Sequence, residues 1–239
     1  MSGAGPRHPY DLVLVIGAPR SGTTWLQRLL GSHDAVATTQ ETDLLDKYVG
    51  RWLAQWDQHL PADPAEWAAN RHKGLPAVLT EAELVEILGS VTTRVYDKVA
   101  SLKPTASVVL DKNPDYGPVL ARVAGPGGML PECRVVHLIR DGRDVAASLV
   151  AAGTSWGSSW APRQVGAAAR WWRERVLAAR GAGLGPDRYL EVRYEDLEAD
   201  GAACLARCLA FCGVEAGEPE CAAALARFPL GGGDGAVGA

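Results

Sequence analysis

Apolar residues along the chain gather first in short, nearly continuous runs that are bounded by glycine, proline or polar residues. These runs lie at Asp11 to Gly17, Ala35 to Thr39, Ser107 to Leu110, Arg134 to Ile139 and Tyr189 to Val192. Runs of this length that are apolar through most positions predict strands of a sheet that is covered on both faces. We therefore expect a buried sheet built from about five short strands.

Between these runs the apolar residues recur at helical spacing, which predicts helices. Thr80 and Glu83 have the spacing of a capping box, and apolar residues at helical spacing follow them. The predicted helices cover Thr23 to Leu30, most of 43–103 with breaks around Pro61 to Pro64 and Gly74 to Pro76, Arg140 to Ala152, Gln164 to Arg180, and 199–226. Strands that alternate with helices predict an α/β domain with a parallel sheet.

Length and charge narrow the class of protein. The chain has 239 residues and a formal charge of −4, so we expect one domain over 1–239 and no nucleic-acid partner. The apolar runs are far shorter than the ~20 residues of a membrane-spanning helix. The first nine residues lack the apolar core of a signal peptide, so we expect no membrane partner and a cytoplasmic location. The glycine-rich ends, 1–10 and 231–239, are expected to be disordered.

The segment that follows the first predicted strand has the spacing of a phosphate-binding loop. Gly17 and Gly22 match G-x-x-x-x-G, and such a loop offers backbone N–H groups and a helix N-terminus to an anion. A nucleotide triphosphatase would carry lysine at position 23, where this chain has Thr23, and the one cation of the loop is Arg20. The loop therefore suits a shorter anion than a triphosphate, although a glycine turn could also simply join strand to helix.

A second candidate anion site follows the strand Arg134 to Ile139. Arg140 stands at the carboxyl end of this strand, where open α/β sheets bind ligands, and Ser148 lies eight residues later on the predicted helix. Arginine can bind a phosphate through two hydrogen bonds, and a serine hydroxyl can add another. The alternative is an ordinary surface ion pair between Arg140 and Asp144.

Residues 19–25, Pro-Arg-Ser-Gly-Thr-Thr-Trp, resemble the 5'-phosphosulfate loop of sulfotransferases that use 3'-phosphoadenylyl sulfate (PAPS). The resemblance extends to Arg140 and Ser148, which match the family's 3'-phosphate residues, and to Tyr194, which matches a tyrosine near the adenine. It implies a P-loop-like three-layer α/β fold with a central parallel sheet flanked by helices. It also implies PAPS as cofactor, with 3',5'-adenosine bisphosphate as product and no required metal. The implied cofactor residues are Arg20, Ser21, Gly22, Thr23, Thr24, Trp25, Arg140, Ser148 and Tyr194.

The same resemblance suggests the catalytic residues. Glu41 lies 21 residues after Arg20, as the catalytic base does in tyrosylprotein sulfotransferases, and Lys112 matches a lysine that stabilises the transferring group there. Arg20 would meet the charge on the leaving phosphate. The alternatives are an acidic residue in the first turn of a helix for Glu41 and a surface lysine for Lys112. Trp25 and Tyr194 have a similar alternative, as aromatic residues of the core.

Two other functions fit parts of the sequence. In a P-loop kinase, Asp111 at the end of its strand would bind Mg²⁺, but Thr23 in place of lysine argues against it. A non-catalytic PAPS-binding module is disfavoured by the presence of Glu41 and Lys112. Either alternative would keep the loop as an anion site.

The acceptor is expected to be a small molecule, in keeping with a bacterial enzyme that acts on a metabolite. The helical region 43–105 and the loop from Gly153 to Pro162 would form the acceptor side. Their tryptophans are candidates to line it: Trp52, Trp56, Trp67, Trp156 and Trp160. The family usually completes its cofactor site with a basic segment near the C-terminus. In this chain Arg227 takes that role or the segment is absent.

Overall fold

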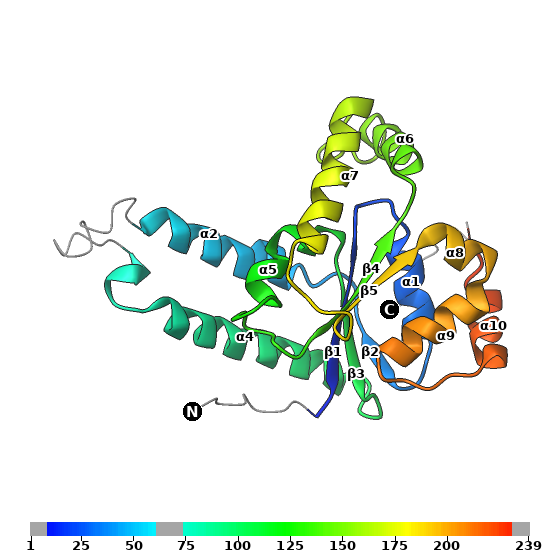
Figure 1. Cartoon of the computed structure of the whole chain (residues 1–239), viewed down its shortest axis with the longest axis horizontal. Coiled ribbons are helices and arrows are strands. Elements are labelled where there is room, and N and C mark those ends of the chain that lie inside the picture. Colours follow the sequence, from blue (N-terminus) through cyan, green and yellow to red (C-terminus); the bar gives the residue numbers. More distant parts are fainter. Residues whose placement is uncertain (1–8, 61–73, 231–239) are drawn as a thin grey trace.

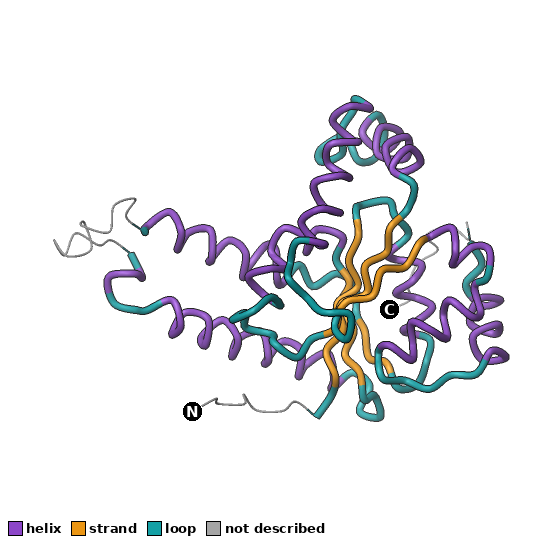
Figure 2. Tube along the Cα trace, viewed as in Figure 1, coloured by secondary structure: helices purple, strands orange, loops and turns teal. Residues whose placement is uncertain are grey.

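The computed structural model describes residues 9–60 and 74–230. Its centre is a five-stranded sheet in which every paired strand is parallel to its neighbour, in the order β2-β3-β1-β4-β5. The strands are β1 (Asp11–Gly17), β2 (Val36–Thr38), β3 (Val108–Lys112), β4 (Arg134–Ile139) and β5 (Tyr189–Arg193). All five predicted strands are present, and Figure 2 shows them as one twisted ribbon at the middle of the molecule.

Alternation along β1 explains why helices cover both faces of the sheet. Leu12, Leu14 and Ile16 belong to one hydrophobic cluster, whereas Val13 and Val15 belong to another on the opposite face. Successive side chains of a strand point to opposite faces, so a strand that is apolar at nearly every position must be covered twice. The predicted three-layer α/β fold is therefore confirmed.

One face is covered by helices that also run outward from the sheet (Figure 1). These elements are a π-helical turn η1 (Leu44–Val49), α2 (Gly50–His59), a 3₁₀ turn η2 (Leu75–Ala77), α4 (Glu81–Ser101), a 3₁₀ turn η3 (Pro114–Val119) and α5 (Leu120–Val123). The predicted capping box of Thr80 and Glu83 is formed at the start of α4. Arg122 bonds both Asp57 of α2 and Glu81 of α4, which joins the two longest of these helices.

The other face is covered by α1 (Thr23–Gly31), α8 (Tyr194–Ala199), α9 (Gly201–Phe211) and α10 (Glu218–Arg227). The remaining helices, α6 (Gly142–Gly153) and α7 (Val165–Arg180), pack on each other. In Figure 1 they rise beyond the ends of β1 and β4. No helix within 9–60 and 74–230 is both long and apolar enough to cross a membrane.

The structure corrects several predicted boundaries. The helix expected from Arg140 begins only at Gly142, because Asp141 caps it through a bond from the Arg143 N–H group. The helical stretch expected over 199–226 is two helices with a turn at Gly213, whose φ of 84° is left-handed. The short elements η3 and α5 were not predicted, since Pro114 and Pro118 obscure the helical pattern there. The disorder expected at the two ends falls almost wholly outside the described residues.

The topology decides where a site can form. β1 lies at the centre of the sheet, with β3 on one side and β4 on the other, so the order of connection reverses at this strand. Ligands of open parallel sheets bind at such a point, beyond the carboxyl ends of the strands. Residues that follow β1, β2, β3, β4 and β5 in sequence therefore meet at one edge of the sheet.

Candidate active site

The loop between β1 and α1 is shaped by two glycines. A Cβ atom on Gly17 would lie 2.6 Å from the carbonyl oxygen of Leu138, so only glycine lets β1 approach β4 so closely here. Gly22 has a φ of 93°, and a Cβ atom there would lie 2.7 Å from the ring of Tyr194. Gly22 also caps α1 without a side-chain hydrogen bond, which leaves the first N–H groups of the helix facing the loop.

Arg20 projects from this loop toward α6. Its backbone has a φ of 73°, which is uncommon for a residue with a side chain. Its Nε donates to Oγ of Ser148 over 3.1 Å, and its guanidinium carbon lies 5.3 Å from the ring centroid of Trp156. The predicted 5'-phosphosulfate arginine and the predicted 3'-phosphate serine are thus brought into direct contact.

Arg140 lies over the ring of Tyr194. The guanidinium carbon of Arg140 is 4.4 Å from that ring centroid, which is close enough for a cation–π contact. Arg140 also forms a long ion pair with Asp144, at 3.8 Å, which is the contact that the alternative interpretation of the sequence expected. Burial raises the pKa of the Tyr194 hydroxyl, so Tyr194 remains a neutral ring at physiological pH.

The turn between β4 and α6 is held by its own polar contacts. The N–H of Asp141 donates to Oε1 of Glu195 over 2.7 Å, which joins this turn to α8. Hydrogen bonds from the side chain and the backbone of Arg143 lower the pKa of Asp141 to about 2. An ionised residue at this cap stabilises the start of α6, the helix that carries Ser148.

Trp25 lies beside Tyr194 at the edge of a cavity. Their ring centroids are 5.8 Å apart in an edge-to-face arrangement, and Nε1 of Trp25 donates to the carbonyl of Phe228 over 2.8 Å. The cavity has a volume of about 250 Å³, and its lining residues are Trp25, Leu197, Glu198, Gly201, Leu225 and Leu230. Arg227 does not line it; its guanidinium carbon lies 5.2 Å from the ring of Phe228.

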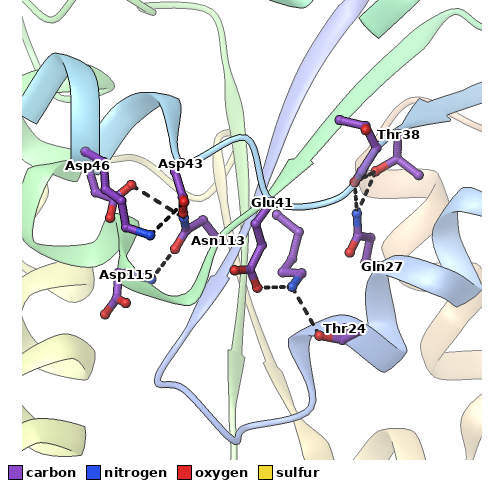
Figure 3. Close-up of polar contacts among 11 residues, drawn as sticks. Thr24, Gln27, Thr38, Glu41, Asp43, Asp46, Asn113 and Asp115 are labelled. Atoms are coloured by element: carbon purple, nitrogen blue, oxygen red, sulfur yellow. Dashed lines mark hydrogen bonds and ion pairs between the residues drawn. The ribbon is translucent and has the colours of Figure 1, made fainter. Parts of the chain in front are cut away.

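Two of the three predicted catalytic residues, Glu41 and Lys112, form a chain of contacts with Thr24 at the start of α1 (Figure 3). Nζ of Lys112 donates to Oγ1 of Thr24 over 3.1 Å and makes an ion pair with Oε1 of Glu41. The side chain of Lys112 is only 4% exposed, whereas that of Glu41 is 44% exposed. The structure therefore places a buried ammonium between the loop and a carboxylate that reaches solvent.

Asp111, the residue before Lys112, faces the other layer of the fold. It is 2% exposed, and its Oδ2 accepts hydrogen bonds from the hydroxyls of Thr42, Tyr116 and Tyr96 over 2.8, 2.8 and 2.9 Å. Burial raises the pKa of the Asp111 carboxyl, and these hydrogen bonds oppose that shift. A kinase would use Asp111 to bind Mg²⁺ at the phosphates, and these buried contacts are the wrong surroundings for that role.

Sequence reasoning missed several contacts around these residues. Nothing in the sequence pattern indicated that Trp156 would lie on Arg20. Asn113 was visible in the segment Leu110 to Pro114, yet its bond to Asp43 depends on how residues 41–43 cross the sheet edge. Of the tryptophans proposed for the acceptor side, Trp52, Trp156 and Trp160 are exposed. Trp56 is buried in the core, which corrects that proposal, and Trp67 lies outside the described residues.

The site has the features needed to hold a phosphorylated nucleotide. Within 9–60 and 74–230, seven buried side-chain atoms have no hydrogen-bond partner, and two of them are Oγ of Ser21 and Nε of Arg140. Buried polar atoms of this kind are uncommon in native proteins and call for a partner. Ser21 and Arg140 lie in the two predicted anion segments, so these two residues fit a ligand that carries two anionic groups.

Comparison with known proteins identifies a family for this chain. A model of the sulfotransferase family matches residues 12–218. An uncharacterized protein of Aquifex aeolicus (strain VF5) is 32% identical over 149 residues, which are 60% of this chain and 17% of that protein. The chain thus spans about a sixth of the length of this curated relative.

Solved structures share the fold at low sequence identity. A sulfotransferase domain from the curacin biosynthetic pathway has a TM-score of 0.57 and 19% identity, over 90% of this chain and 77% of that one. A sulfotransferase domain from the Synechococcus PCC 7002 olefin synthase has a TM-score of 0.56 and 22% identity, over 92% and 80% of the chains. A mouse sulfotransferase complexed with PAP has a TM-score of 0.51 and 15% identity, over 93% and 65%.

Proposed function

Because this chain belongs to the sulfotransferase family, we propose that it transfers the sulfuryl group of PAPS to a hydroxyl or amine of a small-molecule acceptor, with Glu41 as base. The transfer would be in line, with the donor held in the loop and the acceptor facing Glu41. The observation that carries this proposal is the contact chain Thr24–Lys112–Glu41, which joins the anion loop to a solvent-reaching carboxylate.

The cofactor would be held at both of its anionic ends. Backbone N–H groups at the start of α1, with Arg20 and Ser21, suit the 5'-phosphosulfate, and Arg140 with Ser148 suits the 3'-phosphate. The cavity beside Trp25 and Tyr194 is the proposed position of the adenine ring of the cofactor. PAPS, when bound, supplies the activated sulfuryl group.

Side chains of this protein would accept the proton of the acceptor and stabilise the negative charge that develops during transfer. Glu41 would accept the proton of the attacking hydroxyl or amine, since its carboxylate reaches solvent and is paired with Lys112 beside the loop. Lys112 would hold Glu41 in place and add positive charge next to Thr24, where negative charge develops on the transferring group. Arg20 would stabilise the leaving phosphate. A sulfuryl group carries less charge than a phosphoryl group, so these cations suffice without a metal.

The acceptor side is proposed to be formed by residues 43–105 together with the loop from Gly153 to Pro162. Trp156 and Trp160 are exposed there, with ring centroids 5.5 Å apart, and Trp156 lies on Arg20. Trp52 is exposed on α2. Exposed indole rings at these positions favour an acceptor with an apolar or aromatic part.

Calorimetric titration tests the cofactor part of this proposal without knowledge of the acceptor. The purified protein is titrated with 3',5'-adenosine bisphosphate and separately with ATP, each with and without Mg²⁺. We expect micromolar binding of the bisphosphate without Mg²⁺ and much weaker binding of ATP. Preference for ATP once Mg²⁺ is present, without binding of the bisphosphate, would contradict the proposal and favour a kinase.

A further inference from the structure

Residues 41–43 bond side chain by side chain to residues 111–113 at the end of β3. The backbone ladder between β2 and β3 ends where Thr38 pairs with Leu110. Beyond that point Glu41 pairs with Lys112, Thr42 donates to Asp111, and Asn113 Nδ2 donates to Oδ1 of Asp43 over 2.9 Å. We call these three contacts the clasp; Figure 3 shows Glu41, Asp43 and Asn113 within it.

In the middle contact of the clasp, Asp111 is buried and Thr42 is half-buried. One oxygen of Asp111 accepts hydrogen bonds from three hydroxyl groups. Two of these hydroxyls belong to Tyr96 and Tyr116, which are themselves buried. A carboxylate in such a place is costly unless it is well hydrogen-bonded. The tyrosines come from α4 and η3, so Asp111 is fixed by two elements that lie outside the loop region.

Thr42 bonds to Asp111, and this bond holds the segment that carries Glu41 against the end of β3. Oγ1 of Thr42 accepts from the N–H of Leu44 over 3.2 Å, donates to Asp111 and lies 3.1 Å from the Tyr116 hydroxyl. These contacts fix the side-chain rotamer of Thr42. The next residue, Asp43, has a left-handed φ of 55°, a conformation that persists only where surrounding contacts hold it.

We propose that Asp111 is a positioning residue for sulfuryl transfer, which acts through Thr42 to hold Glu41 at the mouth of the anion loop. This inference rests on the proposed role of Glu41 as base. Asp111 and Lys112 are consecutive residues of one strand and point to opposite faces, so Asp111 serves the clasp while Lys112 contacts the loop. A small displacement of a catalytic group can cost about 100-fold in rate, which is the reason to fix it from outside the site.

The test compares Thr42→Val, which removes the hydroxyl at nearly constant shape, with Thr42→Ser, which keeps it. PAPS turnover is measured with p-nitrophenol as the probe acceptor, and affinity for 3',5'-adenosine bisphosphate is measured by calorimetry. We expect Thr42→Val to lower kcat by about 100-fold, with KM for PAPS and bisphosphate affinity within about threefold of the unmodified protein. Thr42→Ser should stay within about threefold in kcat.

Two further variants separate positioning from loss of folding. Asp111→Leu, which removes the acceptor oxygens at similar size, should lower kcat at least as much as Thr42→Val does, and the double variant should lose little more, because both remove the bond from Thr42 to Asp111. Thr92→Val is the matched control, since Thr92 is buried and its hydroxyl bonds only within α4 and to Met129. It should leave kcat unchanged.

Hydrogen exchange at the Leu44 amide tests, independently of turnover, whether each variant keeps the contacts of Thr42. We expect exchange to become faster in Thr42→Val and in Asp111→Leu, and to stay unchanged in Thr42→Ser and Thr92→Val. If unmodified protein fails to turn over PAPS, the proposed function fails while the exchange comparison still tests the clasp. If Thr42→Val had the same Leu44 exchange rate and the same kcat as the unmodified protein, the inference would be overturned.

Discussion

The two halves of the site are held in different ways. The anion half consists of the loop Ala18–Gly22 with Arg140 and Ser148, and the base half consists of Glu41, Lys112 and their partners in the clasp. In the anion half the arginines lie on aromatic rings, and Ser21 Oγ and Arg140 Nε are buried without a partner among the described residues. In the base half Glu41, Thr42, Asp43, Lys112 and Asn113 all bond to other protein side chains. There Oδ1 of Asp111, an acceptor and not a donor, is buried without a partner among the described residues.

The difference indicates what each half contributes. Buried donors without partners in the anion half suit a ligand that completes their hydrogen bonds, so this half should govern affinity. The base half is organised by the protein itself, so its residues should govern the rate of the chemical step with little effect on binding. Variants in the two halves should therefore separate in kcat and in cofactor affinity.

The largest expected effect is in the base half. Glu41→Gln removes the proton acceptor at constant shape, so we expect kcat to fall by roughly 10²- to 10⁴-fold, while 3',5'-adenosine bisphosphate binds as before. Steady-state kinetics and calorimetry on the same preparation measure both. Glu86→Gln, on the exposed face of α4, is the control. An active Glu41→Gln enzyme would place the base elsewhere.

Arg20 should connect the two halves, because it belongs to the anion loop and is proposed to stabilise the leaving phosphate. Arg20→Ala should lower kcat by about 10²- to 10³-fold and also weaken bisphosphate binding. Arg20→Lys keeps a positive charge and should recover part of the rate. If Arg20→Ala changed affinity alone, the residue would belong to the anion half only, and the assigned role in charge stabilisation would be wrong.

Arg140→Ala should act on affinity. Loss of a charged donor to a phosphate costs about 1.5–3 kcal/mol, which corresponds to roughly 10- to 100-fold weaker bisphosphate binding, with kcat at saturating PAPS nearly retained. Arg143→Ala is the matched control on the same turn, since its side chain is exposed and bonds Asp141. Equal affinity in Arg140→Ala and unmodified protein would remove Arg140 from the cofactor site.

The smallest effect is expected at Ser148. Ser148→Ala removes one neutral hydroxyl, which is worth about 0.5–1.5 kcal/mol, so bisphosphate affinity should fall by roughly 2- to 12-fold. Calorimetry resolves this change. A larger fall in kcat than in affinity would show that the bond from Arg20 to Ser148 supports the chemical step, and the division between the halves would then need revision.

Prediction from sequence worked best where local chemistry is decisive. The glycines of the loop, the capping box at Thr80 and all five strands follow from short-range patterns, and each is present. It worked less well where a contact joins distant segments. Glu41 and Lys112 are 71 residues apart and Arg20 and Ser148 are 128 apart, so their contacts depend on the order of strands in the sheet.

The tryptophans show that the sequence also does not predict which side chains of a helix are exposed. Trp56 and Trp52 lie on one short helix with similar neighbours in sequence, yet Trp56 is buried while Trp52 is exposed. Position on the helix relative to the sheet decides this, and composition does not. A tryptophan can therefore be assigned to an acceptor surface only after the helix is placed.

The sequence by itself determined the α/β architecture, the anion loop and its lack of a P-loop lysine, because these depend on residues within a few positions of one another. Only the tertiary structure decided that residues 41–43 close onto 111–113, that Arg20 reaches Ser148, and that Asp111 turns away from the loop into a cluster of hydroxyls. These contacts exist because parallel strands bring their carboxyl ends to one edge, and no local pattern encodes which ends will be neighbours.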